Sequence, residues 1–460
     1  MSHKLSRRNF LKLAATASAL TTLLCGTAFA GNSSGESPLL SQNNDKTIGR
    51  MIGTQTYITA NQKDPEEFRK TAAAMAGIGM SSMRMDVLWW DTRNIDKETQ
   101  VSTVNAEGDA AFLERIRICA GLNMSPILVF PPVHTSLPET QFGWEWMGWP
   151  TTEKNKQAYA EWVADEVAAI NQALPNLKIT VQLGNEVSKN NEWKKYADDY
   201  ADLVKLTSEL LKDRGLKNYT LALGSVDLAQ GDVNAADLMK YYRQNRVLDS
   251  VDLVTLQFYG RDANNEFAPE GVLGILDATL AELKGKAFSV TEVGQDRFTH
   301  SMATDKPDPE AMATKERLQS AHVVRAVLIA LCKGAKHVTI YEARDRHLNG
   351  EEYHEKPGAA SFLGMIKQDR NLTMLGQTIA KFVKDNGELQ PLPSFEQMHD
   401  NPRHYQVTLQ AANGKKIYLR WKEATFDKGD ANFPDIMPKA FDKPYQPRRE
   451  QNLQAGAARL

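Results

Sequence analysis

The sequence of 460 residues predicts an α/β fold, a (β/α)8 TIM barrel followed by a small C-terminal β appendage. Three observations lead to this prediction. Short apolar runs recur along the chain, and longer segments with helical periodicity separate them, so that strand and helix alternate eight times. The turn after the first run, Gln55–Ile58, lacks the glycine-rich phosphate loop that an open, doubly wound sheet usually carries there. The alternation therefore favours a closed barrel.

Most of the strand candidates are short and apolar without strict alternation, which is typical of parallel strands buried on both faces. The candidates are Met51–Thr56, Ser82–Asp86, Ser125–Phe130, Ile179–Leu183, Leu221–Ser225, Leu253–Phe258, Ala287–Thr291 and His337–Tyr341. Eight runs of this kind match the strand number of the barrel.

Helical periodicity fills the gaps between the strands. Asp64 followed by Pro65 predicts a helix start, because Asp caps the free amides and Pro suits the first turn. Long helices are predicted over residues 154–173, 193–214 and 309–333, and Gly334 is expected to end the last of them.

The pattern changes after the barrel, which we place at residues 48–387. Tyr405–Gln410 and Lys416–Trp421 alternate apolar with polar residues and flank Asn413-Gly414, a β-hairpin signature. We therefore predict a small β appendage at residues 388–422, with strands preceding residue 51 as candidates for the same sheet. Residues 423–460 are polar and are expected to form a loose tail.

The first 30 residues have the order of a cleavable signal peptide: a basic segment, an apolar run, and then Ala28-Phe29-Ala30. Arg7 and Arg8 resemble the twin-arginine export signal. The apolar run is shorter than the about 20 residues that span a bilayer. We therefore expect export by the twin-arginine machinery to the periplasm or beyond, and no stable membrane insertion after cleavage. Residues 31–47 are expected to be disordered.

Composition excludes several classes of protein. A formal net charge of −2 gives no case for nucleic acid as the partner. Cys25 lies in the export segment, so the mature chain keeps only Cys119 and Cys332, which we expect to be buried, inert thiols. The His and carboxylate residues between 344 and 355 are irregularly spaced, which favours a solvated charged loop over a metal site. No metal or other cofactor is expected.

Two carboxylates follow apolar strands. Glu186 closes the fourth strand in the run Gln182–Glu186, and Glu292 closes the seventh. Catalytic groups of such barrels lie at the carboxyl ends of the strands. A retaining glycosidase needs two carboxyl groups about 5–5.5 Å apart, one protonated to assist the leaving oxygen and one ionised to attack the anomeric carbon. The two glutamates are the candidates for these roles.

This arrangement resembles the clan A glycoside hydrolases, whose catalytic glutamates lie on barrel strands 4 and 7. The resemblance implies that Glu186 is the acid/base and that Glu292 is the nucleophile. It also implies that Asn185 binds the sugar 2-hydroxyl, that Arg84 lies under the nucleophile and that Tyr259 hydrogen-bonds it.

Residues 319–345, including Tyr341 as a substrate-binding candidate, are most similar to family 39 exopolysaccharide hydrolases, with family 5 next. The resemblance covers about residues 50–385. Two departures stand out. Val187 replaces the proline that often follows the Asn-Glu pair, and residues 342–345 differ from the tryptophan-rich ending common in family 5.

The long loop after the third strand, residues 131–150, is rich in aromatic residues. Trp144 and Trp146, together with Trp89 and Trp90 after the second strand, either stack on sugar rings or pack their loops onto the barrel. His134 either hydrogen-bonds a sugar hydroxyl or holds its own loop.

The sequence thus predicts a retaining O-glycosyl hydrolase. Its partner is expected to be an extracellular or periplasmic polysaccharide, and the aromatic loops favour endo-acting cleavage. The alternative is a catalytically inactive barrel that binds polysaccharide during exopolysaccharide secretion. A metal-dependent barrel hydrolase is discounted, because the first strand carries no His pair.

Overall fold

A computed structural model describes residues 46–56, 64–96, 98–99, 101–137, 149–188, 193–228, 234–260, 268–295, 309–345, 363–367, 369–398, 403–423 and 437–445. The predicted signal peptide, and residues 31–45 of the predicted disordered N-terminus, lie outside the described residues.

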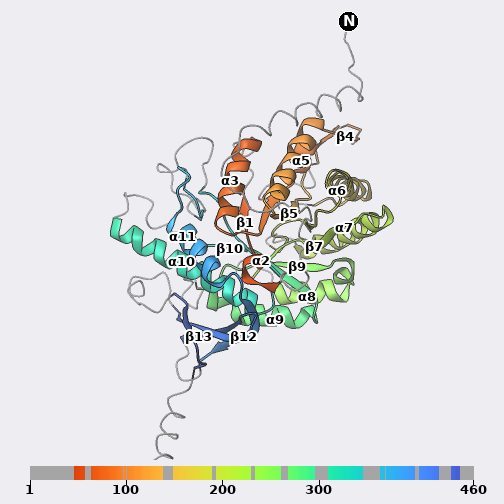
Figure 1. Cartoon of the computed structure of the whole chain (residues 1–460). Coiled ribbons are helices and arrows are strands. Elements are labelled where there is room, and N and C mark those ends of the chain that lie inside the picture. The colour runs from red at the N-terminus through yellow and green to blue at the C-terminus, as the bar shows by residue number, and fades with distance from the viewer. Residues whose placement is uncertain are drawn as a thin grey trace, which may run out of the picture. The chain divides into compact units, whose positions relative to one another are not determined.

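Eight parallel strands close into a barrel (Figure 1). In order around it they are β1 (Ile52–Thr56), β2 (Ser82–Asp86), β5 (Ser125–Phe130), β6 (Ile179–Leu183), β7 (Tyr219–Leu223), β9 (Leu253–Gln257), β10 (Ala287–Val293) and β11 (Val338–Ile340), which pairs again with β1. The prediction of a (β/α)8 barrel is confirmed, and each predicted strand coincides with an observed one to within two residues.

The fifth barrel strand differs from its prediction, Leu221–Ser225, because it is interrupted. β7 ends at Leu223, and the two-residue β8 (Val226–Asp227) then pairs with β9. The break contains Gly224 and Ser225. A Cβ on Gly224 would lie 2.5 Å from the Leu183 carbonyl oxygen, so the break packs directly on the end of β6.

The helices surround the barrel as α3 (Pro65–Gly77), α5 (Ala106–Gly121), α6 (Glu153–Ala173), α7 (Trp193–Asp213), α8 (Ala235–Gln244), α9 (Leu273–Leu283), α10 (Pro309–Cys332) and α11 (Met374–Asn386). Shorter helical segments are α2 (Ile48–Met51), α4 (Trp89–Thr92), η5 (Val247–Ser250) and η6 (Pro269–Val272). The predicted start at Asp64 is confirmed, since its side chain accepts the Glu66 amide at 2.9 Å. None of the helices in the described part of the chain is long and apolar enough to cross a membrane.

A short hairpin, β3 (Arg93–Ile95) and β4 (Ser102–Val104), is inserted between β2 and α5. The sequence did not predict it, because strands of three residues are too short to show a periodic pattern. Cys119 and Cys332 are free and buried as predicted, and burial raises the pKa of each thiol to about 12.

The C-terminal appendage is an antiparallel sheet of β12 (Gln390–Gln397), β13 (His404–Gln410), β14 (Lys416–Lys422) and β15 (Lys439–Phe441). The predicted hairpin is confirmed as β13 and β14. Two expectations are corrected. β15 lies within the predicted loose tail, and the described residues before 51 form α2 rather than a strand of this sheet.

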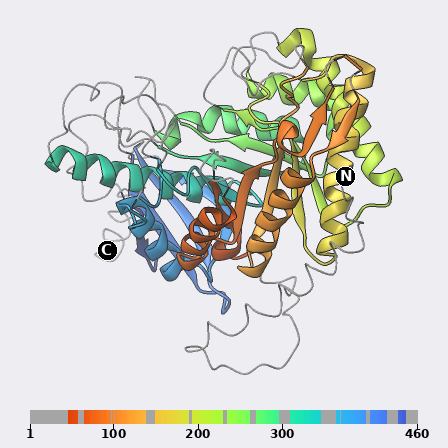
Figure 2. The same cartoon turned by 90° about the horizontal axis from the view of Figure 1, so that it is seen from above.

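The sheet is anchored on the barrel helices. α10 packs against β12 and β13 (Figure 2), and the Trp421 indole donates to Oε1 of Glu270 at 2.8 Å. Arg325 on α10 donates to the carbonyl oxygen of Lys422 at 3.2 Å. Both Trp421 and Arg325 are fully buried, so the appendage shares a core with the barrel.

Candidate active site

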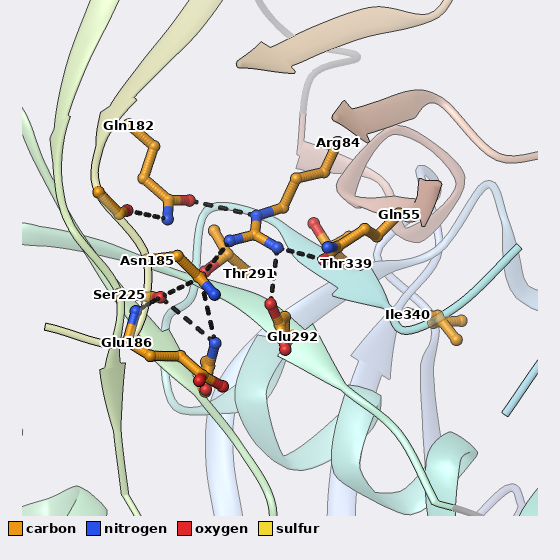
Figure 3. A network of polar contacts seen from close by, with 12 residues as sticks. Gln55, Arg84, Gln182, Asn185, Glu186, Ser225, Thr291, Glu292, Thr339 and Ile340 are labelled. Carbon is orange, nitrogen blue, oxygen red and sulfur yellow. Dashed lines mark hydrogen bonds and ion pairs between the residues drawn. The ribbon is translucent and has the colours of Figure 1, made fainter. Parts of the chain in front are cut away.

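The centre of the site is the guanidinium of Arg84, which is fully buried in the middle of β2. Its Nη1 donates to Oε1 of Glu292 at 2.7 Å and also to Oε1 of Gln55. Its Nη2 donates to Oδ1 of Asn185 at 2.7 Å, and its Nε to Oε1 of Gln182 at 3.3 Å. Figure 3 shows how these side chains converge from different strands of the barrel. One buried cation on β2 thus links side chains from β1, from β10 and from β6 with the turn that follows it.

Glu292 on β10, the seventh barrel strand, is 4% exposed and has a donor on each carboxylate oxygen. Arg84 donates to Oε1, and the Tyr259 hydroxyl donates to Oε2 at 2.9 Å. The register of β10 against β9 shifts between Val290 and Glu292. Bulges of this kind redirect a side chain at barrel rims. The two donors hold Glu292 in a fixed orientation and stabilise its ionised form.

Asn185 and Glu186 lie on a tight turn after β6, the fourth barrel strand. Gly184 has φ +89°, and Glu186 has φ +51°, which is unusual for a residue with a side chain. The Glu186 amide donates to Oγ of Ser225 at 2.9 Å. In Figure 3 the Glu186 side chain extends from this turn toward the side where Glu292 lies.

The Tyr259 hydroxyl links the two glutamates electrostatically. Burial raises the pKa of Tyr259 well above its usual value, and the charges of Glu292, Glu186 and Asp227 add to the rise. The phenol therefore stays protonated and remains a hydrogen-bond donor to Glu292. Because both glutamates act on this one hydroxyl, they belong to the same end of the barrel.

Four polar residues of the network were not identified from the sequence as site residues: Gln55, Gln182, Ser225 and Gln257. All four are buried, and each lies in or just after a barrel strand. The Gln257 Nε2 donates to Oδ1 of Asn185 and to Oγ of Ser225, both at 3.3 Å. The three glutamines left a sequence signal, since glutamine is rare inside buried strands, whereas Ser225 left none.

His134 is tied to the protein backbone at both ring nitrogens. Its Nδ1 accepts the Ser136 amide at 3.0 Å, and its Nε2 lies 3.3 Å from the Arg93 carbonyl oxygen. Its ring also packs edge-on against Trp89. These contacts favour the structural interpretation of His134, and its role in sugar binding stays a prediction.

The aromatic candidates fall into three groups. Trp89 is fully buried and stacks on Trp162 with ring centroids 5.4 Å apart, so it packs its loop onto the barrel. Tyr341 directly follows β11 and its amide donates to the Val293 carbonyl oxygen at 2.8 Å, which places it beside the strand that carries Glu292. Trp144 and Trp146 lie outside the described residues.

Within the described part of the chain, three or more His, Cys, Asp or Glu side chains do not come together in a way that could hold a metal ion. Of the charged loop after β11, Arg344 and Asp345 are described, and the remainder lies outside the described residues.

No family model and no curated protein matches this sequence. Solved structures do match. A family 39 glycoside hydrolase from Bacteroides cellulosilyticus WH2 has a TM-score of 0.57 at 15% identity, covering 83% of this chain and 71% of that one. This is the fold of the family 39 glycoside hydrolases. A monomeric β-xylosidase from Caulobacter crescentus CB15 follows with a TM-score of 0.55 at 12% identity, covering 84% and 76%.

A family 39 enzyme from Xanthomonas axonopodis pv. citri also matches, with a TM-score of 0.54 at 13% identity, covering 82% of this chain and 72% of that one. The resemblance drawn from the sequence is confirmed at the level of the fold. Because the identities are this low, the likeness carries the fold alone, and the chemistry has to be argued from the residues of the site.

Proposed function

We propose that the protein is a retaining glycoside hydrolase in which Glu292 is the nucleophile and Glu186 is the acid/base. The observation that carries the proposal is the pair of donors on Glu292. Arg84 and Tyr259 keep this buried carboxylate ionised and oriented, as a nucleophile requires. Glu186 follows β6, the fourth barrel strand, where the resemblance to the clan A enzymes places the acid/base.

The reaction then runs in two displacements. A Glu292 carboxylate oxygen attacks the anomeric carbon while the Glu186 carboxyl gives its proton to the glycosidic oxygen, and the aglycone leaves as an alcohol. Glu186, now a carboxylate, takes a proton from water, and the hydroxide attacks the same carbon. The ester bond to Glu292 breaks, Glu186 is protonated again, and the configuration is retained.

Asn185 is assigned to the sugar 2-hydroxyl. Its Oδ1 already accepts hydrogen bonds from Arg84, Ser225 and Gln257. Its Nδ2 makes no hydrogen bond among the described residues and remains available as a donor to substrate. Hydrogen bonds to the 2-hydroxyl strengthen in the transition state of this reaction.

The substrate is proposed to be an extracellular or periplasmic polysaccharide that the enzyme cleaves internally. The twin-arginine signal supports export, and the aromatic residues of the 131–150 loop support binding of several sugar rings. Tyr341 is proposed to contribute a further aromatic surface beside Glu292.

The test is an assay for new reducing ends on a panel of bacterial and plant polysaccharides. Wild type, Glu292→Gln, Glu186→Gln and the control Glu161→Gln, an exposed glutamate on α6, are compared. We expect wild type and the control to release oligosaccharides from one polymer and the other two variants to release none. If wild type cleaves no polymer but binds one as tightly as Glu292→Gln does, the alternative of a non-catalytic polysaccharide-binding barrel replaces this proposal.

A further inference from the structure

Ser225 occupies the break between β7 and β8 and is fully buried. Its hydroxyl donates to Oδ1 of Asn185 at 2.7 Å. The same oxygen accepts the Glu186 amide at 2.9 Å and the Gln257 Nε2 at 3.3 Å. A serine hydroxyl has one donor and two acceptor positions, so all three are used. Each bond leads to the Asn-Glu pair or to a side chain that holds it.

The main chain of Ser225 adds a fourth bond to the same turn, because the Val187 amide donates to its carbonyl oxygen at 3.0 Å. The amides of Glu186 and Val187, which are consecutive in the turn after β6, therefore both donate hydrogen bonds to Ser225. Tyr200 links the end of β6 to the break after β7. Its hydroxyl donates to the Leu183 carbonyl oxygen at 2.6 Å and accepts the Gly224 amide at 2.8 Å.

The turn needs this support because Glu186 adopts a left-handed backbone conformation with φ +51°. Residues other than glycine, asparagine and aspartate seldom adopt this backbone conformation, and it persists only where the surrounding structure enforces it. The bond from the Glu186 amide to the Ser225 hydroxyl is one such enforcing contact. It fixes the direction in which the Glu186 side chain leaves the turn.

Ser225 also sets the orientation of the Asn185 amide group. Three donors converge on Oδ1 of Asn185, from Ser225, Arg84 and Gln257. The Arg84 guanidinium has no acceptor, and both acceptor positions of the Ser225 hydroxyl are already filled, so these two partners require the oxygen of the Asn185 amide group to face them. The side chain is therefore held with Nδ2 turned away from the network.

We propose that Ser225 is a positioning residue for proton transfer and 2-hydroxyl binding: its hydroxyl holds the Glu186 backbone and orients Asn185. The proposal rests on the proposed function only for its kinetic test. Its structural test depends on the geometry alone. Ser225 touches no reacting atom. It acts through Glu186, which must deliver a proton to the leaving oxygen in the first displacement and remove one from water in the second.

The kinetic test compares Ser225→Ala with Ser289→Ala. Ser289 is also a buried barrel serine, on β10, but its hydroxyl has no hydrogen-bond partner among the described residues. Phenyl and 2,4-dinitrophenyl glycosides of the sugar released by wild type are the substrates. Only the phenyl glycoside needs a proton to leave, so kcat/KM separates acid catalysis from general damage to the site.

We expect kcat/KM of Ser225→Ala to fall by about 10- to 100-fold on the phenyl glycoside, the size of a small misplacement of a catalytic group. On the dinitrophenyl glycoside the fall is smaller, because this substrate needs no proton and reports only the orientation of Asn185 on the 2-hydroxyl, and Ser289→Ala matches wild type on both. Equal losses on the two glycosides, or no loss on either, would overturn the proposal.

A crystal structure of Ser225→Ala is the second measurement, and it needs no substrate. We expect Glu186 to leave φ +51° or its carboxylate to move by about 1 Å or more, with the barrel strands unchanged. A structure in which Glu186 and Asn185 keep their places overturns the proposal even if the kinetic loss is seen. If wild type proves inactive, the proposed function fails, and this structure still decides the role of Ser225.

Discussion

Two buried arginines in this protein are partnered in opposite ways. Arg84, at the centre of the barrel, binds one carboxylate, Glu292. Its other hydrogen bonds go to the side-chain oxygens of three neutral residues. Arg93, on the β3–β4 hairpin, contacts three carboxylates. Burial is nearly complete for both arginines, so the number of negative charges around each is what distinguishes the two regions.

The carboxylates around Arg93 outnumber its single charge. Its Nη1 lies 2.9 Å from both Asp109 and Glu166, and its Nη2 lies 3.5 Å from Asp165. Burial raises the pKa of Glu166 to about 8, with Asp109 adding to the rise and Arg93 opposing it. Burial likewise raises the pKa of Asp109. This cluster therefore keeps a proton at neutral pH.

A buried arginine thus has two different roles in this protein, depending on how many carboxylates surround it. Around Arg84 a single carboxylate is paired and the remaining contacts are neutral, an arrangement that preserves a negative charge for chemistry. Around Arg93 the excess of carboxylates is relieved by protonation, an arrangement that suits a structural junction of the hairpin with α5 and α6. The predictions that follow test this difference, from the largest expected effect to the smallest.

Arg84→Met should be the most damaging change. It leaves Glu292 buried without its cation, which destabilises a fold by about 3–5 kcal/mol. It also removes the donor that orients the nucleophile, so kcat/KM should fall by at least about 10²-fold. Urea unfolding and kinetics on the cleaved polymer measure the two effects. Arg214→Met, which removes a half-exposed arginine paired with Asp165, is the control and should leave activity unchanged.

Tyr259→Phe should affect activity more than stability. It removes the 2.9 Å bond to Oε2 of Glu292 but keeps the ring. Hydrogen bonds to charged groups are worth about 1.5–3 kcal/mol, which corresponds to a loss in kcat/KM of about 10- to 100-fold. A variant that unfolds more readily but retains full activity would show that the hydroxyl serves packing rather than the nucleophile.

Glu166→Gln should change how stability depends on pH. The unfolded pKa of glutamate is about 4.3. In the folded wild type the pKa of Glu166 is about 8. Between about pH 4.3 and pH 8 the folded protein therefore keeps a proton that the unfolded chain has lost, so the free energy of unfolding falls as pH rises. Glutamine removes this contribution. At pH 8.5 the variant should therefore be more stable than wild type by about 1 kcal/mol or more, since each pKa unit corresponds to about 1.4 kcal/mol.

Unfolding in urea at pH 5.5, 7.0 and 8.5 measures this difference directly. Equal pH profiles for wild type and Glu166→Gln would show that the cluster around Arg93 holds no proton at neutral pH. The contrast with Arg84 would then disappear.

Asp165→Asn should have the smallest effect. Its side chain is 46% exposed and lies 3.5 Å from Arg93, so solvent screens the interaction. Exposed ion pairs contribute about 0–1 kcal/mol, and the change in the free energy of unfolding should stay in that range. A larger loss would mean that Asp165 stabilises the fold substantially through Arg93 or through Arg214, which it contacts at 2.7 Å.

Much of the fold followed from the sequence because buried parallel strands leave a plain signal. β2, β5 and β6 match their predicted bounds residue for residue, and β5 and β6 are largely apolar runs between helical segments. The same rule located Glu186 and Glu292, because strand ends mark the catalytic face of a barrel. Short or interrupted elements escaped prediction. β3, β4 and β15 have three residues each, and the break at Ser225 reflects packing on Leu183 that no local pattern encodes.

The supporting network of the site was harder to predict than its glutamates. Gln55, Gln182 and Gln257 stand in apolar strands, where a sequence pattern shows only that a polar residue interrupts the run. Which partner each one meets depends on the register between strands, as in the pairing of Gln55 with Arg84. His134 shows the same limit. The sequence left a sugar ligand and a loop-holding histidine as alternatives, and only the fold shows that both ring nitrogens contact the backbone.

The most direct test of the account is to trap the covalent intermediate. A 2-deoxy-2-fluoro glycosyl fluoride of the sugar released from the cleaved polymer is incubated with the mature enzyme, and the labelled peptide is sequenced by mass spectrometry. We predict one sugar per chain, attached as an ester to Glu292 and absent from Glu292→Gln. A label on another residue, or the absence of any label from an enzyme that turns over the polymer with inverted configuration, would contradict the assignment of Glu292 as the nucleophile.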